Sequence, residues 1–388
     1  MEVFNTHSRV LITCNKRLAP YLVKEVEELG FSITRSFSTG VEIEGTVNDC
    51  IVLNLNLRTA SQILYSLKSF GARNPEELYQ ELISIAWEEL IDFAGYFSIT
   101  SNVENEFIRT PLFANVKVKD AIVDRIRQKK NVRPDSGPLA NKTVVHLYWR
   151  NNMAEVYLDT SGEVISKHGY RKLPGKAPML EALAAGTIMA TGWDRSSTFV
   201  NPMCGSGTLA IEAALLATNK SPGFFRMNYG FMHILGYDEQ VFFAERRKLK
   251  DKAKKQLEFR IIASDISEEA VDTARKNAKT AGVDHLIDFE VVDFEETSVP
   301  EGAGVVMFNP EYGERLGVHS KLEATYKRIG DFLKKKCKGY RGYIFTGNPD
   351  LAKKIGLRAS RRIEFYNGKL DCRLLEYELY EGTRREDA

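Results

Sequence analysis

The chain has 388 residues, and its 54 lysines and arginines nearly balance its 52 aspartates and glutamates, which gives a formal net charge of +2. This length favours two or three domains over one. No apolar run reaches the roughly 20 residues that cross a membrane, and no amino-terminal signal pattern is visible. We therefore expect a cytoplasmic protein with no membrane partner.

The five cysteines are scattered along the chain and show no CxxC spacing: Cys14, Cys50, Cys204, Cys337 and Cys372. This arrangement argues against a disulfide framework and against a zinc site. The six histidines are isolated from one another, so we expect no metal. Basic clusters occur at 125–133, 246–255 and 333–341, where nucleic-acid contacts and ordinary solvated helix faces are equally good explanations.

The first sixty residues predict a small α+β unit. Residues 9–14 have the pattern of a strand, and residues 18–30 have helical spacing that stops at Gly30. Residues 31–45 predict two strands joined by a turn at Thr39-Gly40, and residues 47–70 predict a second helix.

A second unit is predicted from about residue 75 to residue 159. Helices are expected at 75–87 and 116–130, and strands at 96–103, 142–150 and 152–161. The following segment, 161–178, is rich in glycine, proline and charge, which is typical of a linker or a functional loop.

From Met179 onward, strands and helices alternate, which predicts a parallel, doubly wound sheet. The expected strands are 197–202, 260–267, 287–294, 304–313 and 341–348, and the expected helices are 179–192, 208–217, 268–282 and 322–339. Residues 219–259 are predicted to be an insertion in this domain.

Three consecutive strands of this domain end in residues suited to a nucleotide-like cofactor. The first is followed by Gly205 and Gly207, which let the backbone approach a ligand at a helix N-terminus. The second ends at Asp265, which can accept bonds from ribose hydroxyls, although an N-cap role is the alternative. The third is followed by Asp293, which can accept from an adenine amino group or be an ordinary loop acid.

The fourth strand ends in the sequence NPEY. Asn309 and the Pro310 carbonyl can both accept from one amino group, and Tyr312 can stack on a planar base. Such a pair of acceptors orients an amine for reaction, which depends on orientation more than on acid–base strength. A simple Asn-Pro turn beside a buried tyrosine is the alternative.

Motifs in both halves of the chain resemble the THUMP-containing RNA guanine-N2 methyltransferases, and the resemblance covers nearly the whole sequence. They are, in order, KVKDAIVD, LDTSGE, HGYRK, NPMCGSGTLAIEAA, ASDIS, NPEYGERL and NGKLDC. Within this family the chain looks most similar to the half of the bacterial 23S rRNA methyltransferases that modifies a guanine exocyclic amine. Because the sequence ends after this half, we expect no fused second methyltransferase in it.

The resemblance implies an α/β fold, in which a Rossmann-like S-adenosylmethionine methyltransferase domain (161–388) is preceded by an α+β ferredoxin-like domain (1–60) and a THUMP RNA-binding domain (61–160). It also implies that Asn309, Pro310 and Tyr312 hold the target base. The cofactor would be bound by Asn201, Pro202, Cys204, Gly205, Ser206, Gly207, Asp265, Ile266, Asp293 and Phe294.

The sequence departs from the family pattern at two positions. Asn201 stands where aspartate is usual, which removes a charge but keeps an acceptor. Glu311 stands where the target motif usually has a second proline, which relaxes the restriction on Pro310. Glu311 could accept a bond from the guanine ring NH.

Five basic residues of the first half are expected to contact RNA phosphates, which position a substrate without reading its sequence: Arg58, Arg109, Lys117, Lys119 and Arg125. For any single one of them, an ordinary solubilising charge is an equally good explanation. The partner is expected to be rRNA or tRNA. For the oligomeric state, monomer and homodimer both stay open.

Three functions compete on these observations. The first is guanine-N2 methylation, in 23S rRNA or alternatively in tRNA. The second is a catalytically weak RNA-binding factor, with Glu311 as the sign of decay. The third is a nucleotide-dependent oxidoreductase. Against it, the sequence has no GxGxxG motif, and Asp265 lies too far along the chain from the glycine loop.

Overall fold

The computed structural model describes residues 3–106, 108, 110–173, 179–312 and 319–380. The chain forms two compact units, and each is described by itself. Unit 1 comprises Met1–Cys14, Leu22–Ser166 and Arg226–Asp251, and unit 2 comprises Asn15–Tyr21, Lys167–Phe225 and Lys252–Ala388. Among the described residues, no helix combines the length and the apolar composition that a membrane crossing requires.

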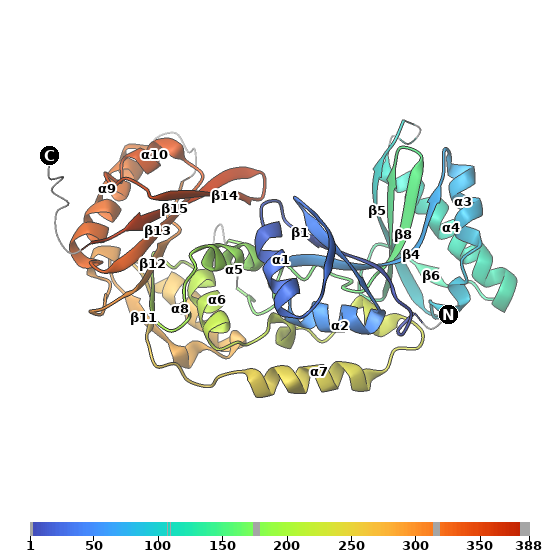
Figure 1. The fold of residues 1–388 in the computed structure, drawn as a ribbon, viewed down its shortest axis with the longest axis horizontal. Coiled ribbons are helices and arrows are strands. Elements are labelled where there is room, and N and C mark those ends of the chain that lie inside the picture. Colours follow the sequence, from blue (N-terminus) through green and yellow to red (C-terminus); the bar gives the residue numbers. More distant parts are fainter. Residues whose placement is uncertain (1–2, 107, 109, 174–178, 313–318, 381–388) are drawn as a thin grey trace. The chain divides into compact units, whose positions relative to one another are not determined.

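Unit 1 is built on one eight-stranded sheet with the order β2-β3-β1-β4-β8-β7-β5-β6 (Figure 1). Its strands are β1 (Ser8–Cys14), β2 (Ile33–Phe37), β3 (Gly40–Gly45), β4 (Ala60–Gly71), β5 (Tyr96–Glu104), β6 (Asp135–Ser136), β7 (Thr143–Arg150) and β8 (Met153–Asp159). Strand β4 pairs with β1 on one side and with β8 on the other. The two small units expected from the sequence therefore share a continuous sheet.

The expected helix at 47–70 is wrong in its second half. Helix α2 (Val47–Asn56) begins at a capping box formed by Thr46 and Asp49, and the backbone is already extended at Leu57. The buried carboxylate of Glu25 accepts from the amides of Arg58 and Thr59 at 2.8 and 3.0 Å. This acceptor lies far away in the sequence, so local periodicity could not show that β4 would begin there.

The other helices of this part of the chain are α1 (Ala19–Glu28), α3 (Pro75–Ile83), α4 (Pro111–Lys130) and α7 (Glu239–Lys252). The predicted insertion contributes to unit 1 through residues 226–251. The amide of Phe231 donates to the Thr160 carbonyl at 2.9 Å, and the Asn56 amide donates to Glu245 at 3.1 Å. The segment 161–388 is therefore not one continuous compact unit.

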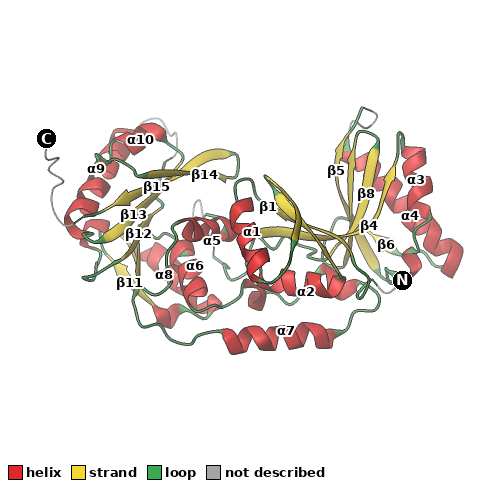
Figure 2. Ribbon diagram, in the orientation of Figure 1, coloured by secondary structure: helices red, strands yellow, loops and turns green. Residues whose placement is uncertain are grey.

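Unit 2 contains a seven-stranded sheet with the order β11-β10-β9-β12-β13-β15-β14. Its strands, drawn in yellow in Figure 2, are β9 (Thr198–Pro202), β10 (Ile261–Asp265), β11 (Ile287–Val291), β12 (Gly304–Phe308), β13 (Tyr340–Thr346), β14 (Arg361–Asn367) and β15 (Leu370–Glu378). The first five strands in this order are parallel, as expected. The last two form an antiparallel hairpin at the edge.

The helices of unit 2 follow from the alternation of strands and helices: α5 (Glu181–Ala190), α6 (Thr208–Ala217), α8 (Glu268–Ala281), α9 (His319–Lys336) and α10 (Pro349–Lys353). Helices α6 and α8 each contact β10, whereas α9 packs through Tyr326, Ile329 and Phe332 against Val306 and Phe308. From β9 the chain continues to β10 on one side, and β12 is added later on the other side. This reversal places a ligand crevice at the carboxyl ends of β9 and β12.

Candidate active site

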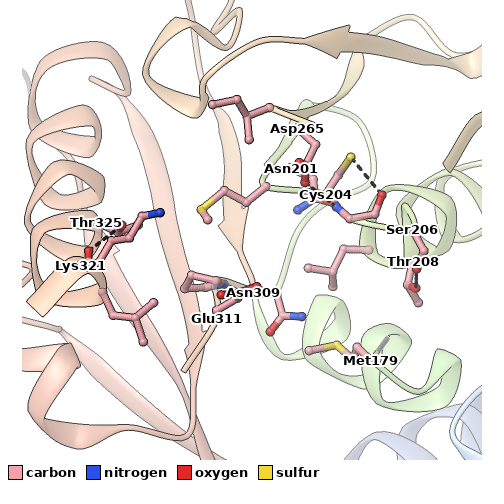
Figure 3. A pocket seen from close by; sticks show the side chains of 16 residues that line it. Met179, Asn201, Cys204, Ser206, Thr208, Asp265, Asn309, Glu311, Lys321 and Thr325 are labelled. Atoms are coloured by element: carbon pink, nitrogen blue, oxygen red, sulfur yellow. Dashed lines mark hydrogen bonds between the residues drawn. The ribbon is translucent and has the colours of Figure 1, made fainter. Parts of the chain in front are cut away.

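A cavity of about 430 Å³ lies at the carboxyl ends of β9, β10 and β12. It is lined by Met179, Asn201, Met203, Cys204, Gly205, Ser206, Thr208, Leu209, Asp265, Ile266, Asn309, Pro310, Glu311, Lys321, Leu322 and Thr325. Figure 3 shows Asp265 and Cys204 on the side of the glycine loop, Lys321 and Thr325 on the opposite side, and Glu311 between them. The structure thus brings three of the four predicted strand ends together.

The loop after β9 is held close to the neighbouring strand and helix. The Cys204 amide donates to the Ser264 carbonyl at 2.8 Å. Gly207 has φ +81°, and a Cβ atom there would lie 2.8 Å from the Cβ of Ala274 on α8. Only glycine satisfies both the left-handed backbone and this close approach. The residue at Gly207 therefore fixes where α6 begins.

The carboxylate of Asp265 connects two loops at the edge of the cavity. Its Oδ2 accepts from the Gly205 amide at 3.0 Å, and its Oδ1 accepts from the Ser267 amide at 3.0 Å. Ser267, rather than Asp265, is the N-cap of α8, since its hydroxyl accepts from the Ala270 amide. Asp265 is therefore free of the capping role that was its alternative and is oriented by both loops.

Two asparagine side chains line the same cavity, and each carries a buried oxygen. Asn201 is 1% exposed and donates to the Met307 carbonyl at 2.9 Å, which ties β9 to β12. The Oδ1 atoms of Asn201 and Asn309 have no hydrogen-bond partner among the described residues. Because an unpaired buried acceptor is costly, these two oxygens are suited to a donor that the ligand brings.

Tyr312 lies outside the cavity lining. Its hydroxyl accepts from the Asn367 amide at 2.9 Å, and its ring makes an edge contact with Phe345 at 6.3 Å between centroids. Burial raises the pKa of Tyr312 to about 12, so the phenol is neutral at physiological pH. Stacking of Tyr312 on a base remains a prediction.

Asp293 and Phe294 also lie outside the cavity lining. Asp293 accepts from the Glu295 amide at 3.0 Å and from Arg328 at 2.8 Å. Burial raises the pKa of Asp293, but these two donors outweigh it and the net shift is downward. Phe294 is 5% exposed and packs edge-on against Phe308, which argues against the expected contact with a cofactor. Pro202 is buried, and neither it nor Gly207 lines the cavity.

Seven residues that line the cavity were not assigned to the site from the sequence: Met179, Met203, Thr208, Leu209, Lys321, Leu322 and Thr325. Lys321, Leu322 and Thr325 lie in the first two turns of α9. That helix was expected, but nothing in its local pattern indicates that its N-terminal turns face the cavity.

Arg171, from the HGYRK motif, supports the cavity from outside. Its guanidinium donates to Glu181 at 2.7 Å, to the Met179 carbonyl at 2.8 Å and to the Thr208 hydroxyl at 3.3 Å. The Arg171 and Glu181 side chains are 10% and 4% exposed. One cation therefore joins the starts of α5 and α6, and two of its partners, Met179 and Thr208, line the cavity.

We expect Arg171→Gln to lower the free energy of unfolding of unit 2 by about 3 kcal/mol, because it leaves the Glu181 carboxylate buried and unpaired. Urea unfolding of the full chain measures this loss. Arg260→Gln is the matched control: its ion pair with Asp288 is about half exposed (52% for both side chains), so its loss should stay below about 1 kcal/mol. Adding Glu181→Gln to Arg171→Gln should recover stability, and no recovery would contradict the explanation.

The residues expected to contact RNA phosphates have mixed positions in unit 1. Arg58 is 8% exposed, and this buried position argues against the expected phosphate contact. Arg125 forms an ion pair with Glu88 at 2.8 Å, and Lys117 and Lys119 approach Glu76 and Asp120 at 3.9 and 3.7 Å. All three lie on α4. Arg109 lies outside the described residues.

Comparison with known protein families assigns three parts of the chain. Residues 168–376 match an RMKL-like methyltransferase domain, residues 9–64 match an RlmL ferredoxin-like domain, and residues 72–159 match a THUMP domain. The first match covers more than half of the sequence.

Curated relatives and solved structures agree with this assignment. The protein named Ribosomal RNA large subunit methyltransferase K/L is 34% identical over 95% of this chain in Syntrophotalea carbinolica, and 36% identical over 94% of it in Psychromonas ingrahamii. These matches cover 53% and 49% of the relatives, so the chain spans about half of their length.

Two solved structures resemble nearly the whole chain. SMU.472, described as a candidate methyltransferase complexed with SAH, is 26% identical with a TM-score of 0.88 and covers 98% of this chain and 100% of its own. A protein from Listeria monocytogenes, described as a predicted N6-adenine-specific DNA methylase, is 26% identical with a TM-score of 0.86, and the match covers 96% of this chain and 97% of that one. The chain belongs to the RMKL-like methyltransferase family.

Proposed function

We propose that this protein transfers a methyl group from S-adenosylmethionine to the exocyclic N2 amine of a guanine in large-subunit rRNA. The observation that carries the proposal is the buried Oδ1 of Asn309, which lines the cavity and has no partner in the described part of the chain. An amine that is to be methylated can supply the missing donor. The names of the curated relatives and the THUMP match support RNA as the substrate.

The lining residues fit the cofactor. The backbone of the loop around Gly205 can lie close against the cofactor. The Asp265 carboxylate, held by the Gly205 and Ser267 amides, can accept hydrogen bonds from the ribose hydroxyls. Bound there, S-adenosylmethionine supplies an electrophilic methyl group. The roles of Asp293 and Phe294 are weaker, because both lie outside the cavity lining.

Asn309 and Pro310 act on the target amine by orientation. Asn309 Oδ1 and the Pro310 carbonyl accept the two N–H bonds of the amine, so its lone pair points away from both acceptors. Orientation of this kind lowers the activation barrier, because the entropy of bringing the two reactants together is already lost on binding. The base must leave its stack to enter the cavity, as is usual for enzymes that modify nucleobases.

Glu311 lines the cavity and is exposed there, so we assign it the guanine ring NH. Glu311→Pro should lower kcat/KM for RNA by about 10-fold to 100-fold, because a hydrogen bond to a charged acceptor is lost. Preference for guanine over adenine should also fall. Steady-state kinetics on matched RNAs measures both effects. Glu311→Gln keeps one acceptor oxygen and should be intermediate. Unchanged turnover and base preference in Glu311→Pro would show that this assignment is wrong.

Transfer of label from S-adenosylmethionine tests the substrate class. The full chain is incubated with rRNA and, separately, with tRNA, both from a strain that lacks the gene. We expect label in large-subunit rRNA and not in tRNA. Label in tRNA alone would favour the tRNA enzyme, and intact cofactor binding without label in either RNA would favour a catalytically weak RNA-binding factor.

A further inference from the structure

A second cavity of about 330 Å³ lies in unit 2, between β13, the β14–β15 hairpin and α10. It is lined by Thr346, Gly347, Pro349, Ala352, Lys353, Leu357, Arg358, Ala359, Arg362, Asp371, Arg373, Leu375 and Tyr377. The lining contains four cations and one carboxylate. Its volume is at the lower end of the range for small-molecule sites. The catalytic arrangement described above uses none of these residues.

Two of the four cations are already neutralised. Lys353 forms an ion pair with Asp350 at 2.8 Å, and Arg373 forms ion pairs with Asp371 and Glu364. Arg358 and Arg362 have no acidic partner within 4 Å in the part of the chain that the structure describes. The cavity therefore offers two guanidinium groups whose charge is available to an anion.

The wall of this cavity includes a buried side chain as well as exposed ones. Tyr377 is 2% exposed and packs in the hydrophobic core of unit 2. Burial raises the pKa of Tyr377 above its usual range, while Arg362 opposes this shift, so the hydroxyl keeps its proton. A neutral phenol that lines the cavity can donate to the same anion as the two arginines.

The second cavity lies close to the first on the same edge of the sheet. The Tyr326 hydroxyl lies 2.9 Å from Thr346 Oγ1, in the second cavity lining, and 3.4 Å from the carbonyl of Glu311, in the first. Strands β12 and β13 are paired, with Phe308 opposite Ile344. Thr346, the last residue of β13, and Pro310 each lie two residues beyond this pair, and neighbouring strands are about 4.8 Å apart. Arg362 lies opposite Leu375 and Tyr377 lies opposite Gly342, so these two side chains lie two to four residues back from Thr346 along β13.

We propose that this second cavity binds a backbone phosphate of the RNA strand that carries the target base, through Arg358, Arg362 and Tyr377. The inference rests on the proposed function for the identity of the strand. A phosphate held here fixes the strand beside the first cavity without reading its sequence. A flipped base then enters the first cavity from a backbone that is already held.

The test uses the full chain with Arg358→Ala/Arg362→Ala and measures filter binding to large-subunit rRNA from a strain that lacks the gene. At about 0.15 M salt we expect at least tenfold weaker binding. The slope of log affinity against log salt should fall in magnitude by about 0.7, the value for one lost phosphate contact. Affinity for SAH should not change, because the two arginines lie outside the first cavity.

Lys276→Ala/Lys279→Ala is the matched control. It removes the same two positive charges from exposed positions in the second half of α8. This half of the helix leads away from the carboxyl end of β10 and therefore away from the cavity edge of the sheet. We expect its rRNA affinity and salt slope to equal those of wild type. Arg362→Ala alone, at an exposed position, keeps the test usable if the double variant unfolds, and it should weaken rRNA binding by less than the double variant does.

Unchanged rRNA binding and salt slope in folded Arg358→Ala/Arg362→Ala would overturn the inference. So would loss of inorganic phosphate binding in that variant with rRNA binding intact, because the site would then serve a free anion. Binding is measured without methyl transfer, so the two proposals can fail separately. rRNA that binds through these arginines but receives no methyl group would support the inference and contradict only the proposed function.

Discussion

Asn309→Ala is expected to lower kcat for methyl transfer by at least about 100-fold, because the amine loses an acceptor that orients it in the transition state. The asparagine oxygen has no partner within the described residues, so its removal breaks no bond that the fold uses there. Single-turnover reactions with labelled S-adenosylmethionine and rRNA, quenched at a series of times, measure the effect.

Two controls separate this loss from a general defect. The SAH affinity and the unfolding midpoint of Asn309→Ala should stay close to those of wild type, since the variant leaves the glycine loop and Asp265 intact. Asn309→Asp keeps an acceptor oxygen and should retain more activity than Asn309→Ala. An Asn309→Ala variant as active as wild type would disprove the orientation mechanism.

Asp265→Ala should have the largest effect on cofactor binding. The carboxylate accepts from the Gly205 and Ser267 amides, and its remaining acceptor capacity faces the cavity that the ribose would enter. Hydrogen bonds to a charged acceptor contribute about 1.5–3 kcal/mol each, so SAH affinity should fall by at least about 10-fold to 100-fold in calorimetry.

Asp265→Asn is the matched control for charge, and it should bind SAH more tightly than Asp265→Ala. Binding of rRNA should remain, because the expected phosphate contacts lie elsewhere. Wild-type SAH affinity in a folded Asp265→Ala variant would contradict the placement of the cofactor in this cavity.

The sequence predicts the parallel part of the unit 2 sheet well, because each strand is short and apolar and strands alternate with helical segments. Gly205, Asp265 and Asn309 were assigned to three strand ends, and the parallel pairing of β9, β10 and β12 brings those ends to one cavity. The rule that carboxyl ends of parallel strands meet at one edge was sufficient for this part of the site.

Contacts between distant parts of the chain account for the errors. The strand β4 was taken for a helix because Glu25, which holds the backbone extended at Arg58 and Thr59, is remote in sequence. The burial of Arg58 has the same origin. The assignment of Phe294 to the cofactor stays a prediction; its ring packs edge-on against Phe308, a contact that no local pattern shows.

The second cavity was not predicted, for a related reason. Its lining comes from β13, α10, the connection between α10 and β14, and the β14–β15 hairpin, and its arginines belong to no motif. The basic cluster at 333–341, which was noted in the sequence, contributes none of the lining residues. Local density of lysine and arginine therefore did not identify where cations gather around a concave surface.

Nucleoside analysis of methylated rRNA tests the central claim most directly. Large-subunit rRNA from a strain that lacks the gene is incubated with the full chain and isotopically labelled S-adenosylmethionine, then digested and analysed by mass spectrometry. The account predicts label in N2-methylguanosine at a defined position, and none with Asn309→Ala. Label confined to another nucleoside, such as N6-methyladenosine, or no label despite intact SAH binding, would contradict it.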